Sequence, residues 1–229
     1  ENRFQKVVLE EFLDEPMELE MLPDGRILFI ERDGAVKLYD FEEDFTETIN
    51  TISVVSKLED GLLGMALDPN FAETQNVFLY YSPTDKIVNR LSRFTFNGDS
   101  LDTDSEKIVL EVETQRDTCC HSGGSVEFGP DGLLYLATGD NTNPFESDGF
   151  SPSDERAGRK YFDAQRTSAN TNDLRGKILR IQPTADGSYT IPAGNLFAEG
   201  TPATRPEIYV MGCRNPWRIA IDSKRNWLY

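Results

Sequence analysis

Histidine and cysteine are scarce in this chain, and their scarcity excludes most metal-centred functions. Among 229 residues there are one histidine, His121, and three cysteines, Cys119, Cys120 and Cys213. Structural zinc sites use four Cys or His ligands, usually with Cys residues in closely spaced pairs, and the sequence has no such spacing. A site made of several histidines is therefore excluded, and chemistry that needs an imidazole must use His121.

Long apolar runs and positive charge are also lacking. No stretch of about 18 apolar residues occurs, so the sequence predicts no membrane span. The chain has 23 Lys and Arg residues against 40 Asp and Glu residues, which gives a net charge of −17. Such an acidic chain repels a phosphate backbone, and we expect no nucleic-acid partner. Because the acidic residues are scattered, they indicate a solvated surface.

The three cysteines leave the redox state open. Cys119 and Cys120 are adjacent and could form a vicinal disulfide, one of them could pair with Cys213, or all three could be reduced. A disulfide would indicate an oxidising compartment. The chain begins at Glu1 with no initiator Met and no visible signal peptide, which is typical of a mature or trimmed product.

Short strand-like runs separated by Asp, Pro and Gly turns dominate the sequence. A strand, a turn built on Asp with Pro or Gly, and an apolar strand recur at residues 21–30, 65–81, 126–136 and 219–229. Asp-Gly favours tight hairpins because its backbone tolerates positive φ. Units of about four strands that recur roughly every 40 residues or more are typical of β-propeller blades.

Three such units and the start of a fourth do not close a ring, and a propeller needs closure to bury its blade faces and edges. We therefore expect residues 1–229 to be a single propeller domain truncated at its C-terminal end, with ring closure beyond Tyr229. Residues 141–173 are rich in Asn, Asp, Ser and Thr but also contain aromatics. They predict an ordered surface loop near a functional face rather than a disordered insertion.

His121 is the first candidate for a catalytic residue. It precedes a glycine-flanked strand that ends in the turn Asp131-Gly132. Histidine is the side chain best suited to exchange protons near neutral pH, and a polar residue at the start of a strand is well placed for an active site. The alternative is a structural histidine that caps the turn before the strand.

Four phrases in the same order resemble the glucose/sorbosone dehydrogenase family, whose soluble members use pyrroloquinoline quinone (PQQ). The resemblance extends from about Met17 to Tyr229. It implies an all-β fold, a six-bladed β-propeller of four-stranded antiparallel blades, of which this chain covers roughly the first three to four. The phrases are Gly61–Pro69, His121 with Gly129–Tyr135 and Thr138-Gly139-Asp140, Arg175–Ile181, and Met211–Pro216.

The resemblance implies a PQQ- and Ca²⁺-dependent sugar or aldose dehydrogenase that is periplasmic or secreted and passes electrons to an external acceptor. His121 stands where the family has its general base, which removes the proton of the sugar C1 hydroxyl as hydride passes to the quinone. Arg214 and Asn215 match a cofactor-contacting pair, and a guanidinium suits carboxylate or quinone oxygens. Glu59 stands where relatives carry Gln or Glu, and it is expected to contact cofactor or substrate. The calcium ligands are expected beyond Tyr229.

The sequence also departs from the family pattern. Cys213 replaces a histidine between the Gly and the Arg, and Cys120 replaces an acidic residue that precedes the catalytic histidine in the best-known soluble glucose enzymes. Specificity for glucose therefore does not transfer. We expect Asp140 to be structural, bonding loop amides, with Ca²⁺ binding as the alternative. Three acidic residues of the long loop are candidates to shape the substrate cleft: Asp148, Asp154 and Glu155.

Two other functions compete with the dehydrogenase. The first is a non-catalytic propeller that binds a protein or a glycan, since propellers serve many functions and the fold alone decides nothing. The second is a metal-dependent hydrolase of the lactonase type. That reaction needs several acidic or Asn ligands on the central axis, and the sequence does not assemble such a set around Asp140 and Asn141.

Overall fold

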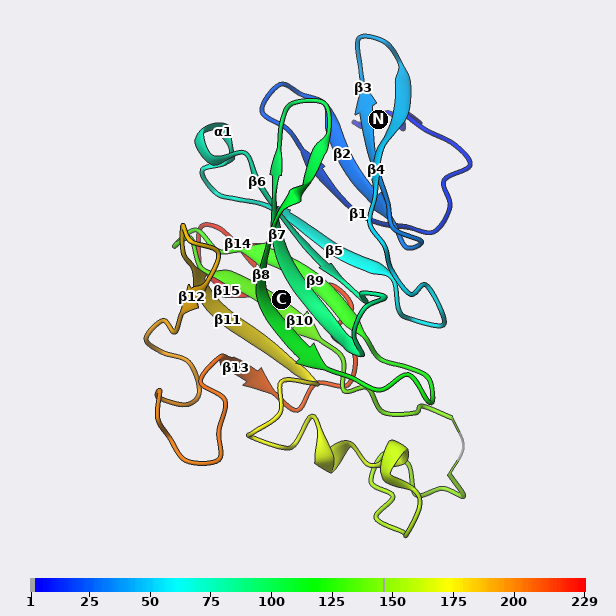
Figure 1. Ribbon diagram of the computed structural model, residues 1–229, viewed down its shortest axis with the longest axis vertical. Coiled ribbons are helices and arrows are strands. Elements are labelled where there is room, and N and C mark those ends of the chain that lie inside the picture. The colour runs from blue at the N-terminus through cyan, green and yellow to red at the C-terminus, as the bar shows by residue number, and fades with distance from the viewer. Residues whose placement is uncertain (1–2, 146) are drawn as a thin grey trace.

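The structure is a computed structural model, and it describes residues 3–145 and 147–229. Antiparallel strands form three sheets and one short hairpin (Figure 1). The first sheet has the strand order β1-β2-β3-β4 and the second has the order β5-β6-β7-β8. Their bounds are β1 Pro16–Met21, β2 Ile27–Glu31, β3 Ala35–Asp40, β4 Phe45–Thr51, β5 Leu62–Leu67, β6 Asn76–Tyr81, β7 Val88–Phe96 and β8 Leu101–Glu113.

The third sheet is built on β9, β10 and β11, and both β12 and β13 pair with β11. It therefore has five strands, where four are expected, because the chain returns to β11 twice. The short strands β14 and β15 pair with each other. The remaining bounds are β9 Gly123–Phe128, β10 Leu134–Thr138, β11 Lys177–Pro183, β12 Tyr189–Thr190, β13 Ile208–Met211, β14 Ile221–Asp222, β15 Trp227–Leu228, the helix α1 Phe71–Thr74, and the 3₁₀ helices η1 Lys160–Phe162 and η2 Ala164–Arg166.

Asp-Gly turns connect the first two strands of both the first and the third sheet, as the sequence predicts. Gly25 in Asp24-Gly25 has φ +95°, and Gly132 in Asp131-Gly132 has φ +76°. The N–H of Gly132 donates to the carbonyl oxygen of Gly129 at 2.9 Å. Because a side chain disfavours positive φ, glycine at these two positions permits the tight hairpins β1–β2 and β9–β10.

Apolar side chains fill the spaces between successive sheets. Along β6, Val77, Leu79 and Tyr81 pack with the core of the first sheet. Phe78 and Tyr80 lie in a second core, shared with the third sheet. Since side chains alternate between the faces of a strand, a continuous apolar run is what a strand buried on both faces requires. The sheets therefore stack as consecutive blades, and the all-β propeller architecture is confirmed.

The strands β1, β5 and β9 are neighbours, as the inner strands of successive blades should be (Figure 1). Two glycines allow β5 and β9 to approach closely. A Cβ atom added at Gly64 would lie 1.8 Å from the carbonyl oxygen of Gly124, and one added at Gly124 would lie 2.6 Å from Cβ of Leu63. The distance between these blades is therefore set by backbone packed directly on backbone.

Residues 141–173 form the ordered loop that the sequence predicts, except that Glu146 lies outside the described residues. The loop contains η1 and η2 and projects from the third sheet (Figure 1). The N–H of Asn143 donates to the carbonyl oxygen of Tyr161 at 2.6 Å, and the Tyr161 hydroxyl donates to Asp117. The loop is thus tied to the segment that leads to His121. In the described parts of the chain, no helix has the length and apolar character needed to cross a bilayer.

We expect the substitution Gly64→Ala to lower the free energy of unfolding by about 2–3 kcal/mol, because the new methyl group would overlap backbone that cannot move aside alone. The matched control is Gly129→Ala, where the added Cβ would first meet Oδ1 of Asp131, the end of a mobile side chain, at 2.6 Å. Thermal unfolding of both variants measures the difference. Equal melting temperatures would contradict the close approach of β5 and β9.

Candidate active site

His121 lies two residues before β9, and its backbone has φ +65°. Its side chain is 7 % exposed, and its Nδ1 atom lies 2.7 Å from Oδ1 of Asp140. Asp140 follows β10, which pairs antiparallel with β9. Because the end of one antiparallel strand meets the start of its partner, the hairpin itself brings these two residues together.

Asp140 is buried and held in place by its own neighbours. Its Oδ1 also accepts the N–H of Thr142 at 2.9 Å, and its own N–H donates to the carbonyl oxygen of Arg214 at 2.8 Å. A carboxylate at Nδ1 favours the histidine tautomer that carries its proton there, which leaves Nε2 as the acceptor. The pair has the geometry of a general base and its orienting group.

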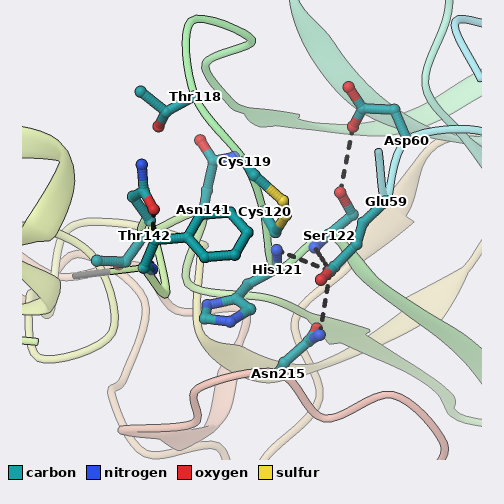
Figure 2. The surroundings of a disulfide bond; sticks show 12 residues. Glu59, Asp60, Thr118, Cys119, Cys120, His121, Ser122, Asn141, Thr142 and Asn215 are labelled. Atoms are coloured by element: carbon teal, nitrogen blue, oxygen red, sulfur yellow. Dashed lines mark hydrogen bonds between the residues drawn. A yellow bond between two sulfur atoms is a disulfide. The ribbon is translucent and has the colours of Figure 1, made fainter. Parts of the chain in front are cut away.

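Glu59 precedes β5 and reaches the turn before β9 (Figure 2). Its Oε2 atom accepts the backbone N–H of His121 at 2.7 Å and that of Ser122 at 3.3 Å. The same oxygen accepts Nδ2 of Asn215 at 3.1 Å, while Oδ1 of Asn215 accepts the N–H of Gly123 at 3.0 Å. Figure 2 shows the imidazole directed away from this carboxylate. The structure therefore brings Glu59, His121 and Asn215 into one cluster.

Arg214 joins this cluster through its backbone, and its side chain is exposed. Within residues 3–145 and 147–229, its guanidinium has neither a hydrogen bond nor an ion pair. The link of Arg214 to the site is its carbonyl oxygen, which accepts the N–H of Asp140, and its side chain is left available to a ligand. It is suited to bind an anionic or carbonyl-bearing ligand at this face.

A disulfide joins Cys119 and Cys120 immediately before His121 (Figure 2). Of the pairings that the sequence left open, this is the vicinal one, and Cys213 is a free thiol. Cys213 is partly buried, and burial raises the pKa of its thiol. The disulfide borders a cavity of about 360 Å³, whose other walls include Glu59, Asp60 and Arg116.

Asp60 supports the same turn from inside this cavity. Its Oδ1 accepts the hydroxyls of Ser122 at 3.1 Å and Ser82 at 3.2 Å, and its Oδ2 lies 3.5 Å from Nε of Arg116. Burial raises the pKa of the Asp60 carboxyl above its ordinary value, although the Arg116 guanidinium opposes this shift. Asp60 therefore binds the Ser122 side chain, while the neighbouring Glu59 binds the backbone.

One group of close potential metal donors occurs among the described residues, and it consists of Glu59, Cys119 and Cys120. Because the two sulfur atoms are joined in a disulfide, they are not thiolate ligands, and calcium prefers hard oxygen donors in any case. Asp140, a candidate calcium ligand in the sequence, contacts His121 instead. The described residues thus provide no side-chain set that fits calcium.

A larger cavity, of about 530 Å³, lies elsewhere. It is bounded by residues 6–13 and by the first three strands of the first sheet, and its lining is mainly apolar. None of the predicted site residues borders it. Of the predicted site residues, Glu59 borders the smaller cavity, so the larger volume does not mark the candidate site.

Lys177 is a buried cation that the sequence analysis did not select. Its Nζ atom donates to the carbonyl oxygens of Thr167 at 2.8 Å, Ser168 at 3.0 Å and Arg175 at 2.7 Å. Burial lowers its pKa to about 8. The residue before Lys177 also supports the site. The N–H of Gly176 donates to the carbonyl oxygen of Gly139, the residue before Asp140, at 2.8 Å.

The acidic residues of the long loop are not brought to the cluster. Asp154 is buried against Arg156 and Ser147, and Asp148 pairs with Arg156 as well. Glu155 accepts Nε2 of Gln165 at 2.7 Å. These carboxylates stabilise the loop internally, and the structure gives no support to a role in shaping the cleft at His121.

The sequence predicts that Asp140 bonds a loop amide, which its bond from the N–H of Thr142 confirms, but it does not predict the contact of Asp140 with the imidazole. The positions of His121 and Asp140 in the sequence could have indicated this contact. His121 lies just before one predicted strand, and Asp140 lies just after the next strand along the chain. That arrangement predicts contact only if the two strands form a hairpin in the right register, with Thr138 opposite Gly123.

The chain is similar to known proteins in both sequence and structure. The family model for glucose/sorbosone dehydrogenase matches residues 13–229. A solved oxidoreductase from Thermus thermophilus, named as a glucose dehydrogenase, is 33% identical with a TM-score of 0.76 and covers 96% of this chain. The PQQ-bound aldose sugar dehydrogenase of Streptomyces coelicolor is 27% identical with a TM-score of 0.70 and covers 95%. Human Hedgehog-interacting protein is 27% identical over 220 residues, which is 86% of this chain.

The chain spans only part of each of these proteins. It covers 58% of the Thermus chain, 56% of the Streptomyces chain and 28% of human Hedgehog-interacting protein. The family match nevertheless includes all three sheets and every residue of the His121 cluster. The chain belongs to the glucose/sorbosone dehydrogenase family.

Proposed function

We propose that this chain is part of a quinoprotein oxidoreductase that oxidises the C1 hydroxyl of a sugar or aldose by hydride transfer to PQQ. The observation that carries the proposal is the 2.7 Å contact between Nδ1 of His121 and Oδ1 of Asp140. An imidazole fixed in this way is a competent proton acceptor. The resemblance to the PQQ-bound aldose sugar dehydrogenase supports the choice of reaction.

In this proposal His121 is the general base. Its Nε2 accepts the proton of the C1 hydroxyl, while the hydrogen on C1 leaves as hydride with its electron pair. PQQ, when bound, supplies the hydride acceptor, and an external electron acceptor later removes the electrons. Asp140 keeps the ring proton on Nδ1 and stabilises the imidazolium that forms. Burial of the dyad holds the ring in one orientation during proton transfer.

The described residues fit the quinone but not its calcium ion. PQQ carries three carboxylates and an ortho-quinone, and the unpartnered guanidinium of Arg214 suits either group. Asn215 follows Arg214 in the chain and binds Glu59. Each keeps capacity for a ligand: one amide hydrogen of Asn215, and Oε1 of Glu59, which makes no hydrogen bond within the described residues. We propose Arg214 and Asn215 as cofactor-binding residues, whereas Glu59 binds the backbone amides of the His121 turn through Oε2. Calcium ligands are expected beyond Tyr229, and no step here depends on them.

The disulfide supports a location outside the reducing cytoplasm. Vicinal or not, disulfides persist in oxidising compartments such as the bacterial periplasm or the cell exterior. We therefore propose that the protein acts in the periplasm or is secreted. Its expected partners are a small-molecule sugar and the external electron acceptor, and its charge of −17 disfavours nucleic acid.

A second candidate function is a non-catalytic propeller that binds a protein or a glycan. It is favoured by the similarity to Hedgehog-interacting protein, which is 27% identical over 86% of this chain. Cys120 also stands where soluble glucose enzymes have an acidic residue. Cofactor binding separates the two functions, since the interaction module needs no quinone.

Binding of the cofactor can be tested directly. Titration of the full-length apo-protein with PQQ and Ca²⁺ should give saturable binding. The absorbance of the quinone measures this binding. Addition of a panel of aldoses should then bleach this absorbance to that of the reduced quinol, and the rates should rank the sugars. Absence of binding to a folded, complete propeller would favour the interaction module over the dehydrogenase.

The roles of His121 and Asp140 can be tested by substitution. We expect His121→Ala to lower kcat by about 10²–10⁴-fold, because the base is lost. Asp140→Asn should also lower kcat, by about 10² or more, because an amide no longer enforces the required tautomer. Steady-state kinetics of the reconstituted enzyme measures both effects, with circular dichroism to verify folding. Full activity of His121→Ala would rule it out as the base.

The state of the three cysteines can be tested by alkylation. Alkylation of the unfolded chain without reductant should label Cys213 alone, and alkylation after reduction should label all three cysteines. Intact mass before and after each treatment counts the labels. Three labels without reductant, in protein isolated under oxidising conditions, would show that the protein has no disulfide. The proposal of an oxidising compartment would then lose its support.

A further inference from the structure

We propose that Glu59 is a positioning residue, which holds the main chain of His121 so that the imidazole faces the substrate. This inference rests on the proposed function, because it assumes that His121 is the base. A residue that only contacts cofactor or substrate would not need to hold the backbone of His121, so this role of Glu59 differs from a ligand contact. In this role, one carboxylate oxygen of Glu59 fixes the backbone of His121, from which the catalytic ring projects.

The geometry centres on Oε2 of Glu59, which accepts three hydrogen bonds (Figure 2). Two come from consecutive backbone amides, those of His121 and Ser122. The third comes from Nδ2 of Asn215, whose Oδ1 in turn accepts the N–H of Gly123. Three successive N–H groups are therefore bound by one carboxylate and by the amide that it orients. The donors come from two segments that are 62 and 156 residues away from Glu59.

The turn needs such support because its backbone is unusual. His121 has φ +65°, Gly123 has φ +68° and Gly124 has φ +130°. The left-handed region is unfavourable for a residue with a side chain, so His121 stays there only if its surroundings determine it. Successive N–H groups that point to one side form a concave anion site, and the Glu59 carboxylate fills it with protein rather than ligand.

The two anchors of His121 are independent of each other. Asp140 holds the ring at Nδ1, whereas Glu59 holds the backbone N–H. A ring held at one end only would be free to pivot about the other. Removal of Glu59 also leaves amide N–H groups without their acceptor at a partly buried position, which favours a different turn. We therefore expect loss of Glu59 to move the imidazole although Asp140 is intact.

Three roles of Glu59 predict different results. A positioning residue affects kcat and the exchange of the amides at 121 and 122, with little change in KM for sugar or in the affinity for PQQ. A ligand contact affects KM or PQQ affinity first. A residue that merely stabilises the fold affects the melting temperature but leaves kcat of the folded fraction unchanged.

The test compares Glu59→Ala with Glu59→Gln in the full-length protein. Gln keeps a carbonyl oxygen that can accept the same N–H groups, whereas Ala removes the acceptor. The matched control is Glu106→Ala, because Glu106 is also partly buried and accepts side-chain bonds from Ser92, at 2.7 Å, and from Tyr81, but lies in the second sheet away from the turn. The Glu106→Ala variant therefore measures the effect of losing a hydrogen-bonded carboxylate that is remote from the His121 turn.

Two measurements on the apo-protein require neither cofactor nor substrate. Hydrogen exchange of peptides that cover residues 119–125 should accelerate by about tenfold or more in Glu59→Ala and little in Glu59→Gln or in the control. The ring signal of His121 in protein labelled with ¹³C-histidine, identified by its loss in His121→Ala, should shift or broaden only in Glu59→Ala. Unchanged exchange and an unchanged ring signal in Glu59→Ala would overturn the proposal.

Kinetics of the PQQ-loaded enzyme supply the functional readout. We expect kcat to fall about 10–10²-fold in Glu59→Ala, because small displacements of a catalytic group have effects of this size, and to recover largely in Glu59→Gln. A loss confined to KM or to PQQ affinity would instead make Glu59 a ligand contact. If no variant and no wild-type protein turns over sugar, the proposed function fails, while the apo measurements still decide whether Glu59 holds the turn.

Discussion

The close approach of β5 and β9 is the constraint on which the site depends. Gly64 and Gly124 let the two inner strands pack backbone against backbone, and a single added Cβ would prevent this. The loops before these strands, which carry Glu59 and His121, are brought together as a consequence. A carboxylate in one blade can therefore bind main-chain amides in the next. Packing of the core thus sets the distances at which the polar groups act.

The His121 turn joins three parts of the propeller. The β9–β10 hairpin supplies Asp140, the loop before β5 supplies Glu59, and the chain after β13 supplies Asn215. Each contributes hydrogen bonds to groups that would otherwise lack partners, and together they hold a left-handed backbone at a residue with a large side chain. An unfavourable conformation that is fixed from several directions is typical of functional sites.

The polar groups nearby divide between structural and ligand-binding roles. Lys177 and Asp60 use their hydrogen bonds within the protein, to backbone carbonyls and to serine hydroxyls. Arg214 differs from both, because its side chain is exposed and makes neither a hydrogen bond nor an ion pair within the described residues.

The sequence by itself determined the all-β blades, the Asp-Gly hairpins and the choice of His121, because strand alternation, turn chemistry and the single histidine are local properties. It also selected Glu59, Arg214 and Asn215 through the family resemblance. Only the tertiary structure decided that Asp140 orients the imidazole and that Glu59 binds backbone amides. It also decided that β11 pairs with two short strands and that Cys119 and Cys120 are joined. These features depend on strand register and on contacts between residues far apart in the chain, which local sequence pattern does not encode.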